Sequence, residues 1–247
     1  MKVYVGKDYE QMSKMAADFI AERIANVKVL GLATGSTPVG MYKELIEKNK
    51  KNEISFKNIK TVNLDEYIGL PVGHKESYRE FMNENLFDHI DINKNDTHVP
   101  FAKNNDDHEA CKSYDELIDS LGGVDIQVLG VGENGHIAFN EPSRCLSYNT
   151  NIITLTESTI KANSRFFDDI KDVPTSAISM GVGKIMEAKT IILLANGPKK
   201  ADAIRELLKG NDITTDCPVT LLKLHKDVYI FIDEQLNELL WLKKKLK

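Results

Sequence analysis

Short apolar runs alternate with amphipathic segments along this chain, and that alternation limits the fold more than any other feature. The runs have the length of buried strands, and the segments between them repeat apolar residues at helical spacing. The predicted strands are VKVLGLA (27–33), IKTVNL (59–64), VDIQVLGV (124–131), TSAISM (175–180), TIILLA (190–195) and DVYIFI (227–232). The predicted helices cover 9–25, 77–90, 106–121 and 199–210, the last ending at Gly210. Strand–helix alternation indicates an α/β fold with a mostly parallel sheet.

The length and charge of the chain set broad limits. Its 247 residues suit one large α/β domain or two small ones, and no segment is long enough to be an interdomain linker. We therefore expect a single domain over 1–247. The formal net charge of -5 disfavours a nucleic-acid partner but allows a pocket that binds a small anion.

The cysteines and apolar runs indicate where the protein is found. Cys111, Cys145 and Cys217 form no CxxC motif, which favours free thiols in a reducing cytoplasm. The amino-terminal segment lacks the apolar core of a signal peptide, and the longest apolar runs are far too short to span a bilayer of about 30 Å. We expect a cytoplasmic protein with no membrane partner.

Because ligands bind at the carboxyl ends of parallel strands, the strand ends are the places to look for chemistry. The first is GLATGSTPVGMY (31–42), in which Gly35 allows a tight turn and Pro38 opens a helix that Ser36 or Thr37 can cap. Free amide groups and the helix dipole there favour a phosphate. A capped helix without a ligand explains the segment equally well, and the GK[ST] of a Walker A loop is absent.

The second strand end is NLDEYIGLP (63–71), where an apolar strand runs directly into Asp65 and Glu66. Acidic residues at the end of a buried strand are frequently functional. On these residues alone, a cap on the following turn is the more common explanation.

The third strand end is GVGENGHIAFNEP (130–142), which formally matches GxGxxG. A dinucleotide site is rejected because Pro142 arrives too soon for a crossover helix and no acidic residue ends a following strand at the expected distance. The loop presents Asn134, His136, Asn140 and Glu141. A hydrogen-bonded acid/base pair of His136 and Glu141 forms if the loop folds back.

Basic residues lie near two further junctions. KANSRFF (161–167) carries Arg165, and NGPKK (196–200) carries Lys199 and Lys200. Each is either a solvated surface charge or part of a phosphate clamp with the loop at 34–37, and the strand-end positions favour the clamp. The other histidines show no paired ligand spacing, so the sequence implies no metal.

These motifs resemble the glucosamine-6-phosphate deaminases (the glucosamine/galactosamine-6-phosphate isomerase family) over nearly the whole chain. The resemblance rests above all on LDEY together with GHIAFNEP, and also on GLATGSTPVGMY, ESYREFMNENLFDHI, KANSRFF and MGVGKIMEAKTIILLANGPKKADAI. It implies a Rossmann-like three-layer α/β/α sandwich. It also implies conversion of glucosamine 6-phosphate and water to fructose 6-phosphate and ammonia, in amino-sugar catabolism, without a cofactor.

The resemblance also assigns roles to residues. The base of the family falls on Asp65, the ring-opening histidine on His136 and its acidic partner on Glu141, with Asn134 in the polar set around the histidine. The phosphate site of this small sugar phosphate falls on the following residues: Gly35, Ser36, Thr37, Arg165 and Lys200.

The sequence also departs from the family. Some members carry aspartate in place of Asn134, so we expect activity with a shifted pH profile. Asn151 and Ile153 stand where the allosteric branch is basic, so we expect no activation by the N-acetylated sugar phosphate. We expect a monomer or a homo-oligomer, and a lid within 143–173. A phosphosugar lactonase on the same fold is the alternative enzyme, and a non-catalytic sugar-phosphate sensor is the alternative of another class.

Overall fold

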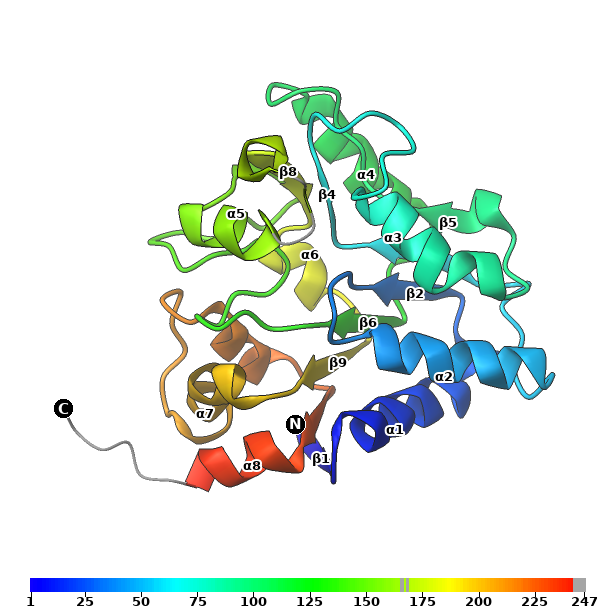
Figure 1. Cartoon of the computed structure of the whole chain (residues 1–247), viewed down its shortest axis with the longest axis vertical. Coiled ribbons are helices and arrows are strands. Elements are labelled where there is room, and N and C mark those ends of the chain that lie inside the picture. The colour runs from blue at the N-terminus through cyan, green and yellow to red at the C-terminus, as the bar shows by residue number, and fades with distance from the viewer. Residues whose placement is uncertain (165–166, 168, 242–247) are drawn as a thin grey trace.

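A parallel sheet of seven strands forms the centre of the molecule (Figure 1). The computed structural model describes residues 1–164, 167 and 169–241 of the chain. The strands lie in the order β1-β10-β9-β6-β2-β3-β5, and each neighbouring pair is parallel. Their bounds are β1 (Lys2–Gly6), β2 (Val29–Leu32), β3 (Lys60–Asn63), β5 (Thr97–His98), β6 (Ile126–Leu129), β9 (Thr190–Ala195) and β10 (Val228–Asp233).

Helices connect the strands and cover the sheet. They are α1 (Tyr9–Ala21), α2 (Val39–Lys50), α3 (Tyr78–Asn85), α4 (His108–Ser120), α5 (Glu157–Asn163), α6 (Val182–Met186), α7 (Ala201–Lys209) and α8 (Glu234–Trp241). Short 3-10 helices cover Ile24–Asn26, Phe87–His89, Lys94–Asp96, Ile170–Asp172, Pro198–Lys200 and Pro218–Leu224. Helix α1 packs on α2, and α2 on α3, while an ion pair between Lys184 and Asp119 joins α6 to α4. Because parallel crossovers are right-handed, these two groups cover opposite faces.

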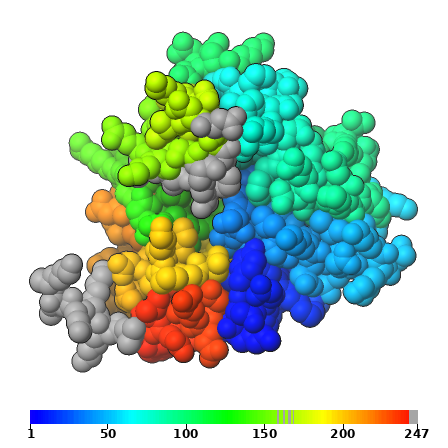
Figure 2. All heavy atoms as spheres, in the orientation of Figure 1, coloured from blue at the N-terminus to red at the C-terminus, as the bar shows by residue number. Residues whose placement is uncertain are grey.

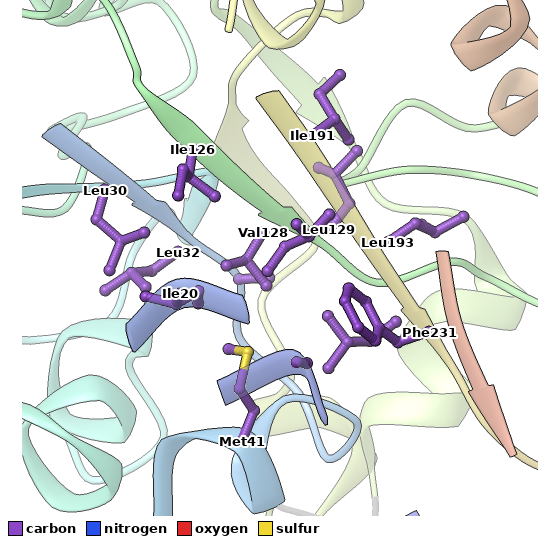
Figure 3. Packing of buried hydrophobic residues seen from close by; sticks show 14 of the residues in the cluster. Ile20, Leu30, Leu32, Met41, Ile126, Val128, Leu129, Ile191, Leu193 and Phe231 are labelled. Carbon is purple, nitrogen blue, oxygen red and sulfur yellow. The ribbon is translucent and has the colours of Figure 1, made fainter. Parts of the chain in front are cut away.

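The hydrophobic core lies between the sheet and its helices (Figure 3). All residues of β2, β6 and β10 are buried, which explains why, apart from Gln127 and Asp233, these strands carry no polar residues in alternation with apolar ones. In Figure 3, Ile20 and Met41 of the helical layer lie beside Leu32 and Val128 of the sheet. Burying a side chain of this size stabilises the fold by about 1.5–3 kcal/mol.

A second, antiparallel sheet joins the first at the end where the site forms. It contains β4 (Asp65–Tyr67), β8 (Ser176–Ser179) and β7 (Asn151–Thr154), in the order β4-β8-β7. The predicted strand at 175–180 is therefore confirmed, but it belongs to this small sheet. The other predicted strands and all four predicted helices are also confirmed in kind. Their ends move by a few residues, and β1, β4, β5 and β7 were not predicted.

The order of the strands reverses between β2 and β6. From β2 the chain moves outward to β3 and β5, whereas from β6 it moves the other way to β9 and β10. The loops that leave the carboxyl ends of β2 and β6 therefore diverge, which is the arrangement where α/β proteins bind ligands. Among the described residues, no helix combines the length and the apolar character needed to cross a membrane. One domain over 1–247 and a lid at 143–173 stay predictions.

Candidate active site

The loop after β6 brings three of the predicted side chains together. The Nδ1 atom of His136 lies 3.1 Å from Oε2 of Glu141. Asn134 donates from Nδ2 to the same Oε2 atom at 2.7 Å, and its Oδ1 accepts from the backbone N–H of His136 at 3.2 Å. The loop therefore folds back on itself, as the acid/base pair requires. It continues to Pro142 without a helix, as the early proline predicted.

Backbone features that few residues tolerate shape this loop. Gly135 has φ +86°, and Ala138 has φ +50°, a left-handed conformation that costs a residue with a Cβ roughly 1–2 kcal/mol. The buried side chain of Asn140 compensates by donating from Nδ2 to the carbonyls of Ile137 (3.0 Å) and Met180 (2.9 Å). The loop is thereby fastened to the end of β8.

A glycine makes room for the imidazole. A Cβ atom built on Gly132 would overlap the ring atoms of His136. The backbone N–H of Gly132 also donates to the carbonyl of His136 at 2.8 Å. The ring of His136 therefore packs directly against the backbone of Gly132. Because no side chain lies between the two, the backbone limits the orientation of the ring.

The electrostatics of Glu141 suit a partner for histidine. Burial alone would raise the pKa of Glu141, but hydrogen bonding and charge from His136, with donors from Asn134 and Thr159, outweigh it and lower the pKa to about 2. The carboxylate is therefore ionised throughout the neutral range. It can hold the imidazole in one orientation and one tautomer.

Asp65 and Glu66, adjacent in sequence, have different environments. Both oxygens of Glu66 accept from backbone N–H groups, those of Tyr67, Tyr78 and Arg79, at 2.8–2.9 Å. Glu66 thus ties the start of α3 to β4. In the described part of the chain, no hydrogen bond reaches the buried carboxyl of Asp65, and burial, with the neighbouring charge of Glu66, raises its pKa to about 8.

The small sheet connects Asp65 to the histidine loop. Asp65 pairs with Ser179 of β8, and Oγ of Ser179 accepts from the backbone N–H of Phe139 at 3.3 Å. The N–H of Met180 donates to the carbonyl of Leu64 at 2.7 Å, while the carbonyl of Met180 accepts from Asn140. Residues 179–180 therefore contact both the segment at Leu64–Asp65 and the histidine loop at 139–140, and so connect the two.

The loop after β2 forms as predicted, but its helix is capped differently. Gly35 turns the chain with φ +94°, and α2 begins at Val39 with Pro38 at the N-cap position. No side chain of the loop caps the helix, so the predicted cap from Ser36 or Thr37 is wrong. Proline at the cap offers no acceptor, and Thr37 Oγ1 instead donates to Oδ1 of Asn196 at 3.2 Å.

That hydrogen bond joins the loop after β2 to the loop after β9. Gly197 turns the second loop with φ +79°, and its N–H donates to Asp233 at 3.0 Å. Lys200 follows at the N-cap of α7, and Lys199 forms an ion pair with Glu133 at 3.1 Å. These contacts link the loops that follow β2, β6 and β9 to one another at the carboxyl ends of the strands. Arg165 lies outside the described residues.

Sequence reasoning missed the contribution of α5. Thr159 donates from Oγ1 to Oε1 of Glu141 at 2.8 Å, so each oxygen of that carboxylate has a donor. At the other end of the helix, Asn163 donates from Nδ2 to the hydroxyl of Tyr67 at 2.7 Å, two residues from Asp65. Only the closeness of TLTEST to the NEP loop in sequence hinted at these contacts.

The described residues contain no group of three or more His, Cys, Asp or Glu side chains that could hold a metal ion. The site instead combines an imidazole–carboxylate pair, a buried carboxyl group, and glycine turns with basic residues near helix N-termini. A parallel sheet that presents this set at its switch point defines an α/β enzyme of acid–base chemistry.

Comparison with known proteins gives the family. The model of "Glucosamine-6-phosphate isomerases/6-phosphogluconolactonase" matches residues 7–231, and the chain belongs to this family. It is 56% identical over 238 residues to a glucosamine-6-phosphate deaminase of Clostridium beijerinckii, covering 96% of this chain and 98% of that one.

Solved structures agree. One described as a monomeric glucosamine-6-phosphate deaminase matches with a TM-score of 0.91 and 44% identity, over 97% of this chain and 100% of the other. A 6-phosphogluconolactonase of Trypanosoma cruzi matches with a TM-score of 0.76 at 19% identity, over 96% of each chain, and shares the fold.

Substituting Gly132 with Ala tests whether the packing of His136 on this glycine positions the imidazole. The added Cβ displaces the ring of His136, and we expect turnover to fall by at least about 10-fold, since small misplacements of a catalytic group are costly. Gly130→Ala is the matched control, because a Cβ there meets nothing within 4 Å. The steady-state rates of Gly132→Ala and Gly130→Ala are compared, and equal rates in the two variants would contradict the packing role of Gly132.

Substituting Thr159 with Val removes a donor from Glu141 and keeps the side-chain shape. We expect kcat to fall by about 3- to 10-fold, because one hydrogen bond that orients the carboxylate is lost. Thr159→Ser keeps the hydroxyl and should retain most of the rate. Both rates are compared with the wild type, and a loss in the serine variant as large as in valine would refute the assignment.

Proposed function

We propose that this protein is a deaminating aldose–ketose isomerase that converts glucosamine 6-phosphate and water to fructose 6-phosphate and ammonia. The carrying observation is the cluster of Asn134, His136 and Glu141, with the imidazole 3.1 Å from the carboxylate, together with the buried carboxyl group of Asp65 that residues 179–180 tie to the same loop. Relatives named glucosamine-6-phosphate deaminase support the substrate, since one is 56% identical over nearly the full length of both chains.

The phosphate group would bind at the loops after β2 and β9. Gly35, Ser36 and Thr37 present backbone amides beside the start of α2, and Lys200 stands at the start of α7. Amide groups and helix N-termini attract anions, and Arg165 would add a bidentate contact. Binding the remote phosphate in this way would orient the reacting end of the sugar.

Ring opening would be the task of His136. The imidazole would take the proton of the anomeric hydroxyl and deliver a proton to the ring oxygen, which breaks the C1–O5 bond and gives the open aldehyde. Glu141, ionised and held by Asn134 and Thr159, would fix the orientation and tautomer of the His136 ring.

Isomerisation would be the task of Asp65. Its carboxylate would remove the proton on C2 of the open chain and return it to C1, while O1 gains the proton that the amine loses. The unsaturation thereby moves from the C1–O bond to the C2–N bond. Water then adds at C2, and the C2–N bond breaks to release ammonia and leave the ketone. A carboxyl group with a pKa near 8 is a stronger base, once ionised, than an ordinary aspartate.

A coupled assay tests the proposal. The protein should release ammonia and fructose 6-phosphate in equal amounts from glucosamine 6-phosphate. In Asp65→Asn, exchange of the C2 proton with solvent and turnover should both fall by more than about 10²-fold, because the base is gone while the phosphate site remains. Near-normal turnover would remove Asp65 from this role, and hydrolysis of a phosphosugar lactone instead would favour the alternative enzyme.

The same substitution should stabilise the fold at neutral pH. Because the folded protein holds the Asp65 proton up to about pH 8 and the unfolded chain loses it near 3.8, the contribution of this group to stability is fully present below pH 3.8 and is lost as pH rises toward 8. Asp65→Asn removes that loss, and we expect a gain of about 1 kcal/mol or more at pH 7, roughly 2–4 °C in Tm.

Glu141→Gln is the control with the opposite expected effect on stability, because the pKa of Glu141 is lowered whereas that of Asp65 is raised. The pKa of Glu141 is lowered from 4.5 to about 2, so its contribution to stability is present above pH 4.5 and is lost as pH falls toward 2. That variant should therefore melt at a lower temperature at pH 7. Thermal melts at pH 4, 7 and 8 separate the two effects, and a Tm for Asp65→Asn that stays below the wild type at pH 8 would contradict the burial argument.

A further inference from the structure

The hydroxyl of Tyr9 contacts the loop after β2 at three backbone groups. It lies 3.0 Å from the carbonyl oxygen of Ser36 and 3.1 Å from that of Thr37, and its proton is donated to this pair. It accepts the N–H of Gly40 at 2.8 Å. A side chain from the first turn of α1 therefore reaches 27–31 positions along the chain to hold a segment to which the proposed phosphate site belongs.

Tyr9 also replaces the missing cap of α2. The first N–H groups of a helix have no partner within it, and a side chain of the N-cap residue normally accepts one. Pro38 at the N-cap cannot do so, and Gly40 is the second residue of α2. Because the acceptor comes from α1, the hydroxyls of Ser36 and Thr37 are not used as caps, and that of Thr37 reaches the loop after β9.

The loop after β2 borders an open cavity on the side of α1. This cavity has a volume of about 490 Å³ and is lined, among others, by Tyr9, Ser13, Ser36, Gly40 and Asn196. Figure 2 shows α1 and α2, in dark and lighter blue, side by side on one face of the molecule. Helix α1 packs closely on the start of α2, since a Cβ on Gly40 would overlap Ser13, whereas Ser36 borders the cavity. At Ser36 the hydrogen bond from Tyr9 fixes the peptide that carries the N–H of Thr37.

We propose that Tyr9 is a positioning residue for substrate binding: its hydroxyl holds the Ser36 carbonyl and so orients the N–H of Thr37, in the same peptide, toward the phosphate of the sugar. The inference rests on the proposed function for the identity of the substrate. Tyr9 sets affinity for the phosphate and takes no part in the chemical steps at C1 and C2. Interactions made equally in the ground and transition states act on KM and leave kcat unchanged.

The test is Tyr9→Phe, which removes one oxygen atom and keeps the ring that packs against the core. We expect KM for glucosamine 6-phosphate to rise by about 3- to 10-fold with kcat within about 2-fold of wild type. The dissociation constant of inorganic phosphate, measured by 31P NMR or calorimetry, should rise by the same factor. Amide exchange at Gly40 should become faster, because its acceptor is gone.

Tyr4→Phe is the matched control, because the ring of Tyr4 stacks on Phe231 in the central sheet, away from this loop. It should leave KM, kcat and phosphate affinity unchanged. A Tyr9→Phe variant that keeps wild-type KM and phosphate affinity overturns the proposal, as does a lower kcat with unchanged KM.

Phosphate binding separates this inference from the proposed function. If the protein releases no ammonia from the sugar but phosphate binding still weakens in Tyr9→Phe, the positioning role stands and the proposed reaction fails. If the Tm of Tyr9→Phe falls strongly, Gly40 exchange and phosphate affinity measured below the melting range still decide the matter.

Discussion

The short antiparallel pairing of β4 with β8 is the constraint on which the site depends. Asp65 opposes Ser179 in this pairing, and the next residue, Met180, accepts from Asn140 in the histidine loop. Two strand ends of the parallel sheet are thereby held to one rigid segment. Without it, the loop after β6 would keep its own internal contacts but would have no fixed relation to the carboxyl group that follows β3. Precision of this kind, within about 0.5 Å, is what acid–base chemistry demands of its scaffold.

Three carboxyl groups in this region have separate roles because their partners differ. Glu66 receives three backbone N–H groups and serves the fold, Glu141 receives an imidazole and two side-chain donors, and Asp65 receives no hydrogen bond from the described residues. Their environments push the pKa of Glu141 down and that of Asp65 up. Two titratable groups driven apart in this way are the usual sign of distinct roles in proton transfer. Burial and local hydrogen bonds, rather than residue type, make the difference.

The sequence was sufficient for the general plan of the fold and for the histidine loop, because both depend on local patterns. Buried parallel strands are apolar runs, and a glycine-rich strand end with His136 and Glu141 can close on itself within a few residues. Local patterns could not tell Asp65 from Glu66, which only the family resemblance separated, since two of the amides that occupy Glu66 come from residues 78–79. It also assigned the cap of α2 to Ser36 or Thr37, because the acceptor supplied by Tyr9 lies in another helix. Contacts between distant segments, such as that of Thr159 with Glu141, leave no periodic pattern.

The solvent-shielded carboxyl of Asp65 has a consequence for how an amino sugar arrives. At neutral pH a group whose pKa lies near 8 mostly carries its proton, so in the proposed reaction an incoming ammonium ion would meet a neutral carboxyl at Asp65. The new positive charge then favours ionisation, and hydrogen ions pass to the surrounding buffer as the complex forms. Binding of the amino sugar is therefore coupled to the release of protons into the medium. The heat released on mixing would then vary with the ionisation enthalpy of the buffer.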